Sequence, residues 1–531
     1  MCGIFAVQAQ GWTDELLKDA FHTLQHRGPD QSQWLRLDAV HVMGFHRLAI
    51  MDTSAAGLQP FRDACSGDAL ICNGEIYNFE NLRHELSQTH NFRSHSDCEV
   101  LLPLIHKIGL TKAVERLDAE FALIYYDAQS HLLMAARDPL GIRPLFYGYG
   151  EETGSIAFAS EAKALHSLCR DIFPFPPGYV FDGYRFQAYR SVVKQAIRSY
   201  PEPSATRDPI RAALTTAVEK RLHADRPLGC LLSGGLDSSL VAALATRLRG
   251  QPITTFAVGC EVDPIDMKYA ALVAEHIGSD HHEVYFNHDD VIALLEEVIA
   301  KTETWDVTTI RASIGMYIVC RYIRKQTEIR VLLTGEVSDE LFGYKYTDYA
   351  PDAAAFQAEA QKRLGELYLY DVLRADRCIA AHGLEARVPF GDLDFVDTVM
   401  AIDPELKRNR YGIGKYLLRQ AFEGDDLLPR SILMREKAAF SDAVGHSMVD
   451  TLKAYAAALI SDQDMAVVGE EFPYATPFTK ESLLYRRIFN RLYPGRERLI
   501  PDFWMPNPTW SGCQVNDPSA RFLANYGASG H

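Results

Sequence analysis

The second residue of the chain, Cys2, has the chemistry of a hydrolytic nucleophile. If Met1 is removed, Cys2 carries a thiol and a free α-amine on the same carbon atom. An α-amine titrates near pH ~8, so it can accept the thiol proton without the help of a histidine. Cys2 is also one of ten cysteines in the chain. Its role therefore has to be judged together with the other segments whose residues could carry out chemistry.

A glycine- and serine-rich segment in the second half of the chain has the composition of a phosphate-binding loop. It reads Ser-Gly-Gly-Leu-Asp-Ser-Ser at residues 233–239, between an expected strand, Gly229–Leu232, and an expected helix, Ser239–Leu248. Glycines let the backbone approach a phosphate, and the helix N-terminus offers unpaired N–H groups. It lacks the lysine of a Walker A loop and is similar to the loop of ATP pyrophosphatases, which cleave ATP between the α and β phosphates.

An acidic segment follows a later strand of the same half of the chain. Residues 334–340 read Thr-Gly-Glu-Val-Ser-Asp-Glu. The carboxyl ends of parallel strands face one crevice, so we expect Glu336 and Asp339 to meet the glycine-rich loop there. Asp237 and Asp339 then form a plausible pair of Mg²⁺ carboxylates. Arg311 and Lys437 are our candidates for the cations that hold the phosphates and an acid substrate.

Two domains must position these residues. Residues 1–190 contain short β-like runs separated by helical stretches, which indicates an α+β layered domain. A polar, irregular linker follows at 191–206. From residue 207 to 531, strands alternate with helix-length connections, which predicts an α/β domain with a doubly wound parallel sheet, and a mostly helical extension begins near residue 340. The expected strands of the first domain are Gly3–Gln8, Val40–Ile50, Ala69–Ile71, Ala122–Tyr126, Leu132–Arg137 and Ile156–Ser160.

Composition narrows the class of protein. The 531 residues include 54 Lys and Arg against 70 Asp and Glu, a net charge of −16, which argues against nucleic acid or an anionic membrane as partner. There is no apolar run of ~18 residues and no signal-peptide pattern at the N-terminus. The cysteines are scattered without a C-x-x-C pair, so we expect reduced thiols in the cytoplasm and no structural zinc.

With these residues in hand, the chain resembles the glutamine-hydrolysing asparagine synthetase family over nearly its whole length. The first domain resembles a class II glutaminase with an N-terminal nucleophile, whose fold is an αββα arrangement of layers. Its matching segments, in order, are residues 1–5, 25–30, 46–50, 73–78 and 96–99. The second domain resembles the synthetase part, with its ATP pyrophosphatase-like sheet, at residues 366–377, 381–390, 493–496 and 517–521.

The resemblance implies roles for residues of the first domain. Cys2 would attack the side-chain amide of glutamine, and Asn73 with the Gly74 N–H would form the oxyanion hole. Arg47 would hold the α-carboxylate of glutamine, while Glu75 and Asp97 would hold its α-ammonium group. The implied glutamine-binding set is Arg47, Leu48, Ala49, Ile50, Met51, Asn73, Gly74, Glu75 and Asp97.

The resemblance also implies the chemistry of the second domain. ATP would adenylate the β-carboxylate of aspartate, and ammonia would displace AMP to give asparagine, with Glu336 and Lys437 as catalytic residues and Arg311 at the acid. Ammonia would travel through an internal tunnel, and the protein would be a homodimer. The implied ATP-binding residues are Leu232, Ser233, Gly234, Gly235, Asp237, Ser238, Ser239, Val258, Thr334 and Gly335, with Mg²⁺ on Asp237 and Asp339.

The chain departs from the family pattern beside the acid-activating site. Val337 stands where the family usually has glycine, and a β-branched residue tolerates positive φ poorly, so we expect a different path for this loop. The stretch 342–346 also deviates. An amidotransferase that acts on another carboxylic acid therefore remains an alternative function. A non-catalytic homologue is a second alternative, but the intact set of polar residues argues against it. Glutaminases joined to a sugar-phosphate or phosphoribosyl site lack the 233–239 loop.

Overall fold

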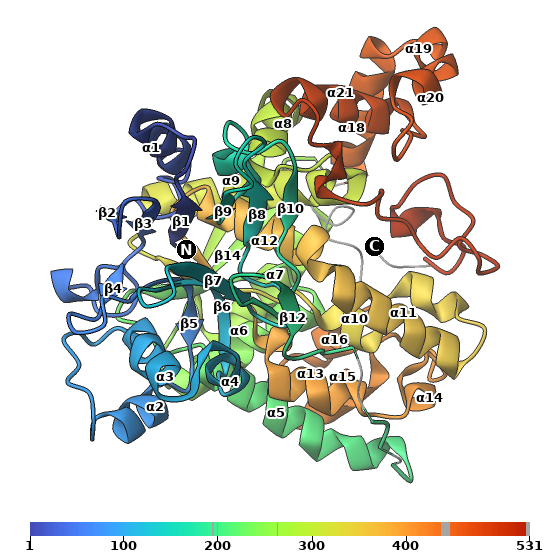
Figure 1. Ribbon diagram of the computed structural model, residues 1–531. Coiled ribbons are helices and arrows are strands. Elements are labelled where there is room, and N and C mark those ends of the chain that lie inside the picture. Colours follow the sequence, from blue (N-terminus) through green and yellow to red (C-terminus); the bar gives the residue numbers. More distant parts are fainter. Residues whose placement is uncertain (194–195, 199, 263, 437–445, 527–531) are drawn as a thin grey trace. The chain divides into compact units, whose positions relative to one another are not determined.

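The computed structural model of the protein (Figure 1) describes residues 1–531 except 194–195, 199, 263, 437–445 and 527–531. The chain forms two compact units. The first contains Met1–Ser191 together with two short segments, Ala224–Pro227 and Ile379–Glu385, which lie within the range predicted for the second domain. The second unit contains Val192–His223, Leu228–Cys378 and Ala386–His531.

Two six-stranded sheets form the centre of the first unit, and their strand pairs are antiparallel. One sheet has the order β10 (Ile172–Pro174), β8 (Phe146–Tyr149), β9 (Ile156–Ala159), β1 (Gly3–Gln8), β3 (His41–Arg47), β2 (Gln31–Arg36). The other has the order β12 (Phe186–Ala188), β11 (Tyr179–Phe181), β7 (Leu132–Arg137), β6 (Ala119–Asp127), β5 (Ala69–Ile76), β4 (Phe61–Arg62).

Helices cover the outer faces of these two sheets. Side chains alternate along each strand, so Ile4 of β1 enters the core between the sheets while Phe5 packs on Phe21 of α1 (Asp14–His22). The outer face of the second sheet packs against α2 (Phe79–Leu86), α3 (Leu101–Ile108) and α4 (Leu110–Glu115), which lie beside β5 and β6 in Figure 1. The layers therefore run helix, sheet, sheet, helix, which confirms the αββα arrangement.

A five-stranded sheet forms the centre of the second unit. Its order is β15 (Asp280–Phe286), β14 (Thr254–Cys260), β13 (Leu228–Leu231), β16 (Val331–Leu333), β17 (Glu385–Arg387), and β13 pairs in parallel with both β14 and β16. The chain leaves β13 towards β14 and β15, then returns to the other side of β13 for β16. This reversal makes the edge between β13 and β16 a switch point, where the loops after both strands lie side by side.

Helices account for most of the remaining second unit, as the alternating pattern predicted. The helices that connect the strands are α5 (Arg207–Lys220), α6 (Leu236–Arg249), α7 (Ile265–Ile277), α8 (His288–Thr302) and α9 (Val307–Gln326). The extension contains α10 (Ser338–Phe342), α11 (Ala353–Glu366), α12 (Asp371–Ala380), α13 (Leu393–Met400), α14 (Pro404–Lys407), α15 (Tyr416–Phe422), α16 (Arg430–Leu433), α18 (His446–Leu459), α19 (Asp462–Ala466), α20 (Val468–Glu471) and α21 (Lys480–Leu492). Across the described ranges, no helix has both the length and the apolar character needed to cross a bilayer.

Candidate active sites

The first candidate site surrounds Cys2, which precedes β1. Gly3 pairs with His46 in the β1–β3 ladder, so Cys2 lies next to Arg47 at the end of β3. The end of β5 and the 3₁₀ helix Asp97–Val100 complete the pocket. Of the residues predicted for glutamine, the pocket is lined by Arg47, Leu48, Ile50, Met51, Asn73, Gly74, Glu75 and Asp97. Ala49 does not line it. Its backbone N–H donates to Asp30 and its carbonyl accepts from Arg226, which fixes the 48–51 loop.

A free hydrogen-bond donor lies beside the nucleophile. The Cys2 backbone N–H donates to Asn73 Oδ1 (2.9 Å), and the Cys2 thiol approaches the Leu48 carbonyl (3.7 Å). Asn73 Nδ2 is buried and has no acceptor among the residues that the structure describes. Buried amide groups of this kind are almost always paired in folded proteins. An unpaired donor next to a nucleophile is suited to the oxygen of a tetrahedral intermediate.

Burial controls the proton state of the nucleophile. The α-amine of Met1 is buried against the Leu384 carbonyl (2.9 Å), and burial lowers its pKa to about 5. Burial raises the pKa of the Cys2 thiol to about 11. While Met1 is present, the thiol is therefore protonated at neutral pH. Once Met1 is removed, an amine on Cys2 in the same buried environment would favour its neutral, basic form.

The charged residues of this pocket are held mainly by backbone groups. Arg47 donates to the carbonyls of Ser54 (2.6 Å) and Asp52. Asp97 accepts from the Ile76 N–H (2.8 Å). A side chain held by the backbone keeps its position before a ligand arrives. The predicted roles of Arg47, Glu75 and Asp97 towards the two ends of glutamine stay predictions.

One residue of this pocket had no sequence signal. Glu385, from the segment Ile379–Glu385, lines the pocket although it is nearly 400 positions from Cys2 in the sequence. Its negative charge is one of the influences that raise the pKa of the Cys2 thiol, after burial. Only the packing of this late segment into the first unit brings it there.

The second candidate site begins at the loop after β13. Gly234 has φ +67°, and a Cβ atom there would lie 2.5 Å from the Ala270 backbone nitrogen, so only glycine fits. The hydroxyls of Ser233 and Ser238 lie 3.0 Å apart, and the Ser233 N–H donates to Ser238 Oγ (3.1 Å). Gly235 caps α6 without a side chain, so the first N–H groups of that helix have no side-chain cap.

The loop after β16 packs directly against this first loop. A Cβ atom on Gly335 would lie 2.9 Å from the Ser238 backbone nitrogen, so a larger residue would push the loops apart. Ser338 Oγ donates to Asp237 (2.7 Å). The Thr334 hydroxyl is buried and has no partner in the described part of the chain. The two predicted segments therefore share one pocket, lined among others by Leu232, Ser233, Gly235, Asp237, Ser238, Val258, Thr334, Gly335, Glu336 and Asp339. Gly234 and Ser239 do not line it.

A lysine that sequence reasoning missed lies between the two predicted metal carboxylates. Lys415 Nζ is 2.8 Å from Asp237 Oδ1 and 2.5 Å from Asp339 Oδ1. Two carboxylates within reach of one cation suit Mg²⁺, which usually takes one or two protein carboxylates and substrate phosphates. Outside the gaps in the described residues, no group of three or more His, Cys, Asp or Glu could hold a metal ion. The residues present therefore fit a metal that arrives with a nucleotide.

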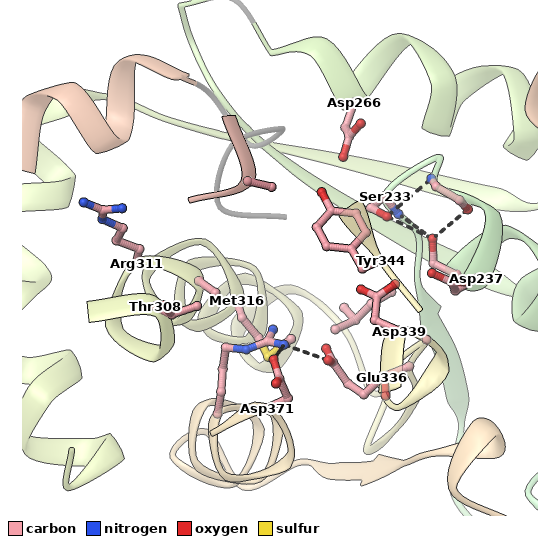
Figure 2. Close-up of a pocket in the computed structure, with 18 of the residues that line it drawn as sticks. Ser233, Asp237, Asp266, Thr308, Arg311, Met316, Glu336, Asp339, Tyr344 and Asp371 are labelled. Atoms are coloured by element: carbon pink, nitrogen blue, oxygen red, sulfur yellow. Dashed lines mark hydrogen bonds and ion pairs between the residues drawn. The ribbon is translucent and has the colours of Figure 1, made fainter. Parts of the chain in front are cut away.

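Arg311, which was predicted to bind the acid substrate, lines the same pocket. Its guanidinium group is buried between two carboxylates, Glu481 (2.5 Å) and Asp517 (2.9 Å). Figure 2 shows Arg311 directed away from Glu336 and Asp339. The arginine at the predicted catalytic residue is instead Arg374, which donates to Glu336 (2.7 Å) and Asp371 (3.2 Å). Glu481 and Asp517 come from distant segments, so no local pattern in the sequence indicated these pairs, and the role of Arg311 towards the acid substrate stays a prediction.

Two further features complete this pocket. Burial and the nearby carboxylates of Asp371 and Asp339 hold the pKa of Glu340 well above its usual range, so its side chain favours the protonated form. Val337 adopts φ +81° and ψ −19°, so the loop makes a left-handed turn at a β-branched residue. The expected difference in loop path from the family stays a prediction. Lys437 lies outside the described residues.

Comparisons with known proteins match both domains. A family model described as a glutamine amidotransferase domain matches residues 1–174, and one described as asparagine synthase matches residues 209–358 and 348–511. The chain is 42% identical to a probable asparagine synthetase [glutamine-hydrolyzing] of Acanthamoeba polyphaga mimivirus, over 98% of this chain and 100% of the relative. It is 40% and 39% identical to the asparagine synthetases [glutamine-hydrolyzing] of Gallus gallus and Homo sapiens, over 99% of each chain. With full-length relatives at this identity and both domains matched in order, the chain belongs to the glutamine-hydrolysing asparagine synthetase family.

Proposed function

We propose that this protein catalyses the ATP-dependent synthesis of L-asparagine from L-aspartate and L-glutamine, releasing AMP, pyrophosphate and glutamate. The observation that carries the proposal is the presence, on one chain, of two complementary pockets. One holds a cysteine beside an unpaired buried amide donor. The other holds a glycine- and serine-rich loop of the phosphate-binding type, together with two carboxylates that contact the ammonium group of Lys415.

In the first unit, Cys2 acts as nucleophile after Met1 has been removed. Its α-amine takes the thiol proton, and the sulfur attacks the side-chain amide carbon of glutamine. Asn73 Nδ2 and the Gly74 N–H donate to the developing oxyanion. The intermediate collapses to a thioester and ammonia, which receives its proton from the amine. Water then attacks the thioester, giving glutamate and the free thiol.

In the second unit, the β-carboxylate of aspartate attacks the α phosphorus of ATP. The products of this step are a β-aspartyl-AMP intermediate and pyrophosphate, whose oxygens the 233–239 loop and the α6 N-terminus bind. Asp237 and Asp339 would hold Mg²⁺, which when bound neutralises phosphate charge. Ammonia then attacks the acyl carbon, AMP leaves, and Glu336 accepts a proton from the attacking nitrogen.

The acid substrate needs a cation in this pocket. Arg311 is already bound by Glu481 and Asp517. We therefore infer that Arg374, which borders Glu336, binds a carboxylate of the aspartate substrate. Lys437 remains a candidate for neutralising charge at the acyl-adenylate. The family relationship also supports a cytoplasmic homodimer in which ammonia reaches the second site unprotonated, since ammonium is not a nucleophile.

The test is product analysis with the purified full chain. Incubated with ATP, Mg²⁺, glutamine and aspartate, it should form asparagine, AMP and pyrophosphate in equal amounts, measured by mass spectrometry and ion chromatography. A panel of other carboxylic acids replaces aspartate in parallel. If glutamate forms without asparagine, the glutaminase assignment stands, but aspartate is not the acceptor of the ammonia. AMP formation with another acid would then identify that acceptor.

A further inference from the structure

Lys415 occupies the position that a metal ion would share with Asp237 and Asp339. Its Nζ lies 2.8 and 2.9 Å from the two oxygens of Asp237 and 2.5 Å from Asp339 Oδ1, and it donates to Ser338 Oγ (2.9 Å). Lys415 is 6% exposed and Asp237 4% exposed. One ammonium group therefore forms ion pairs with both carboxylates.

The backbone at Lys415 is held in an uncommon conformation to achieve this. Lys415 has φ +57° and ψ 35°, in the left-handed region, directly before α15. A residue with a Cβ atom is strained in this region. Such conformations persist where the surrounding structure fixes them, and they concentrate at functional sites. The unusual backbone conformation and the two ion pairs therefore occur at the same residue, Lys415.

The charges at this point determine what can bind. A second cation near Asp237 is Arg419, whose guanidinium group donates to the carbonyls of Gly414 (2.6 Å) and Leu433. A free divalent ion at Asp237 and Asp339 would meet the Lys415 ammonium a few ångströms away, and two positive charges at that distance repel strongly in a buried site. Nucleotide phosphates would change this balance, because they bring negative charge for both cations.

We propose that Lys415 is an internal counter-cation: without nucleotide it neutralises Asp237 and Asp339 and keeps free divalent ions out, and it transfers to phosphate oxygens when the metal arrives with ATP. The inference rests on the metal pair in the proposed function. It makes Lys415 a positioning residue that orders binding, so that the metal enters together with the nucleotide. A purely structural ion pair would stabilise the fold without affecting metal affinity.

The experiment uses Mn²⁺ alone as the probe on the full-length protein. Binding is measured by electron paramagnetic resonance of free Mn²⁺ and by the rise of the melting temperature with Mn²⁺ concentration. K415M replaces the ammonium with an uncharged side chain of similar length. K345M is the matched control, because Lys345 forms a partly buried ion pair with Glu436 (2.7 Å) and not with Asp237 or Asp339.

We expect wild type and K345M to bind Mn²⁺ weakly, and K415M to bind it at least about tenfold more tightly, because the opposing charge has gone. Removing Lys415 leaves two buried carboxylates unpaired, so K415M will be less stable than wild type. Its melting temperature should then rise with Mn²⁺ far more than that of wild type. K415Q, which keeps a hydrogen-bond donor, provides a second uncharged variant with the same expected increase.

Two different failures are distinguishable. If K415M and K415Q bind free Mn²⁺ no more tightly than wild type, yet all bind Mn²⁺ with a non-hydrolysable ATP analogue, the counter-cation role is overturned and the metal pair survives. If D237N and D339N bind the Mn²⁺–nucleotide complex as tightly as wild type, the proposed metal pair itself is overturned, and the role of Lys415 with it.

Discussion

The two pockets of this protein hold their charges in different ways. In the Cys2 pocket, Arg47 donates to main-chain carbonyls and Asp97 accepts from a main-chain N–H. In the nucleotide pocket, charged side chains bind one another: Lys415 binds Asp237 and Asp339, and Arg374 binds Glu336. The first set of partners consists of main-chain groups, and the second consists of movable side chains.

This difference indicates how each pocket meets its ligand. A group held by the backbone cannot change partner without local unfolding, so the Cys2 pocket is formed before glutamine binds. Ion pairs between side chains can exchange when a ligand brings its own charges. We therefore expect the nucleotide pocket to reorganise its pairs on binding, and we expect each site to be disabled without disabling the other.

The largest expected effect comes from a substitution that disables the first site alone. Cys2→Ala should lower glutamine-dependent asparagine synthesis by at least about 10⁴-fold, since the nucleophile is lost. Synthesis with ammonium chloride in place of glutamine should persist within about twofold, because the second pocket shares no residue with the first. Steady-state assays with both nitrogen sources measure this. Loss of both activities in a folded variant would refute separable sites.

The reciprocal change targets Glu336 in the second site. Glu336→Gln removes the proposed proton acceptor and the charge that faces Arg374, and should lower synthesis from either nitrogen source by about 10²–10⁴-fold. Hydrolysis of glutamine to glutamate should continue. Asp371→Asn is the matched control, since Asp371 also contacts Arg374 but has no assigned proton transfer. An unaffected synthesis rate in E336Q would remove Glu336 from the mechanism.

A smaller effect tests the unpaired donor in the first pocket. Asn73→Ala should lower the glutaminase kcat by about 10²–10³-fold, with ammonia-dependent synthesis unchanged, because an oxyanion donor acts only in the transition state. Asn78→Ala is the control, since Asn78 donates to the Arg116 carbonyl outside this pocket. A change in KM for glutamine alone would assign Asn73 to substrate binding instead.

Strain in the second pocket can be measured at Val337. Alanine and glycine both remove the γ-methyl groups of its buried side chain, but only glycine tolerates φ +81° without strain. We expect V337G to be more stable than V337A by about 1 kcal/mol, the reverse of the usual order in regular structure. Denaturant unfolding of the two variants makes the comparison. A V337A protein more stable than V337G would show that the turn is not strained.

The last effect, on the pH dependence of stability, concerns Lys407, a buried lysine that contrasts with Lys415. Its Nζ contacts neutral acceptors, Gln357 Oε1 (3.1 Å) and the Val399 carbonyl (3.3 Å), and burial lowers its pKa to about 7. Between pH about 7 and the unfolded value near 10.5, the unfolded chain binds more protons than the native one. The free energy of unfolding of wild type should therefore rise with pH relative to K407M, by up to about 1.4 kcal/mol per pH unit. Parallel curves for the two proteins would contradict the lowered pKa.

Local patterns in the sequence predicted much of this fold. The strand at Gly3–Gln8 is as predicted, because its apolar residues are bounded by turn-forming ones. The two nucleotide loops met as expected, since carboxyl ends of neighbouring parallel strands share one edge. Short edge strands such as β10 and β12 were missed, because three residues leave too little periodicity to detect.

The residues that sequence reasoning missed arrive by long-range packing. Lys415 lies 178 positions from Asp237, and nothing around Lys415 marks it as the partner of a metal carboxylate. Arg311 illustrates the same point, since Glu481, 170 positions away, binds its guanidinium group. A spacing rule predicts where strand ends meet, but it does not predict which distant side chain neutralises a buried charge.

The most direct test of the central claim follows one nitrogen atom through the protein. Purified full-length chain is incubated with ATP, Mg²⁺, aspartate and glutamine labelled with ¹⁵N at the side-chain amide, and the asparagine is analysed by mass spectrometry. If one chain hydrolyses glutamine and uses its ammonia, the asparagine side-chain amide carries ¹⁵N. Labelled free ammonium with unlabelled asparagine, or with none, would contradict the coupling of the two sites.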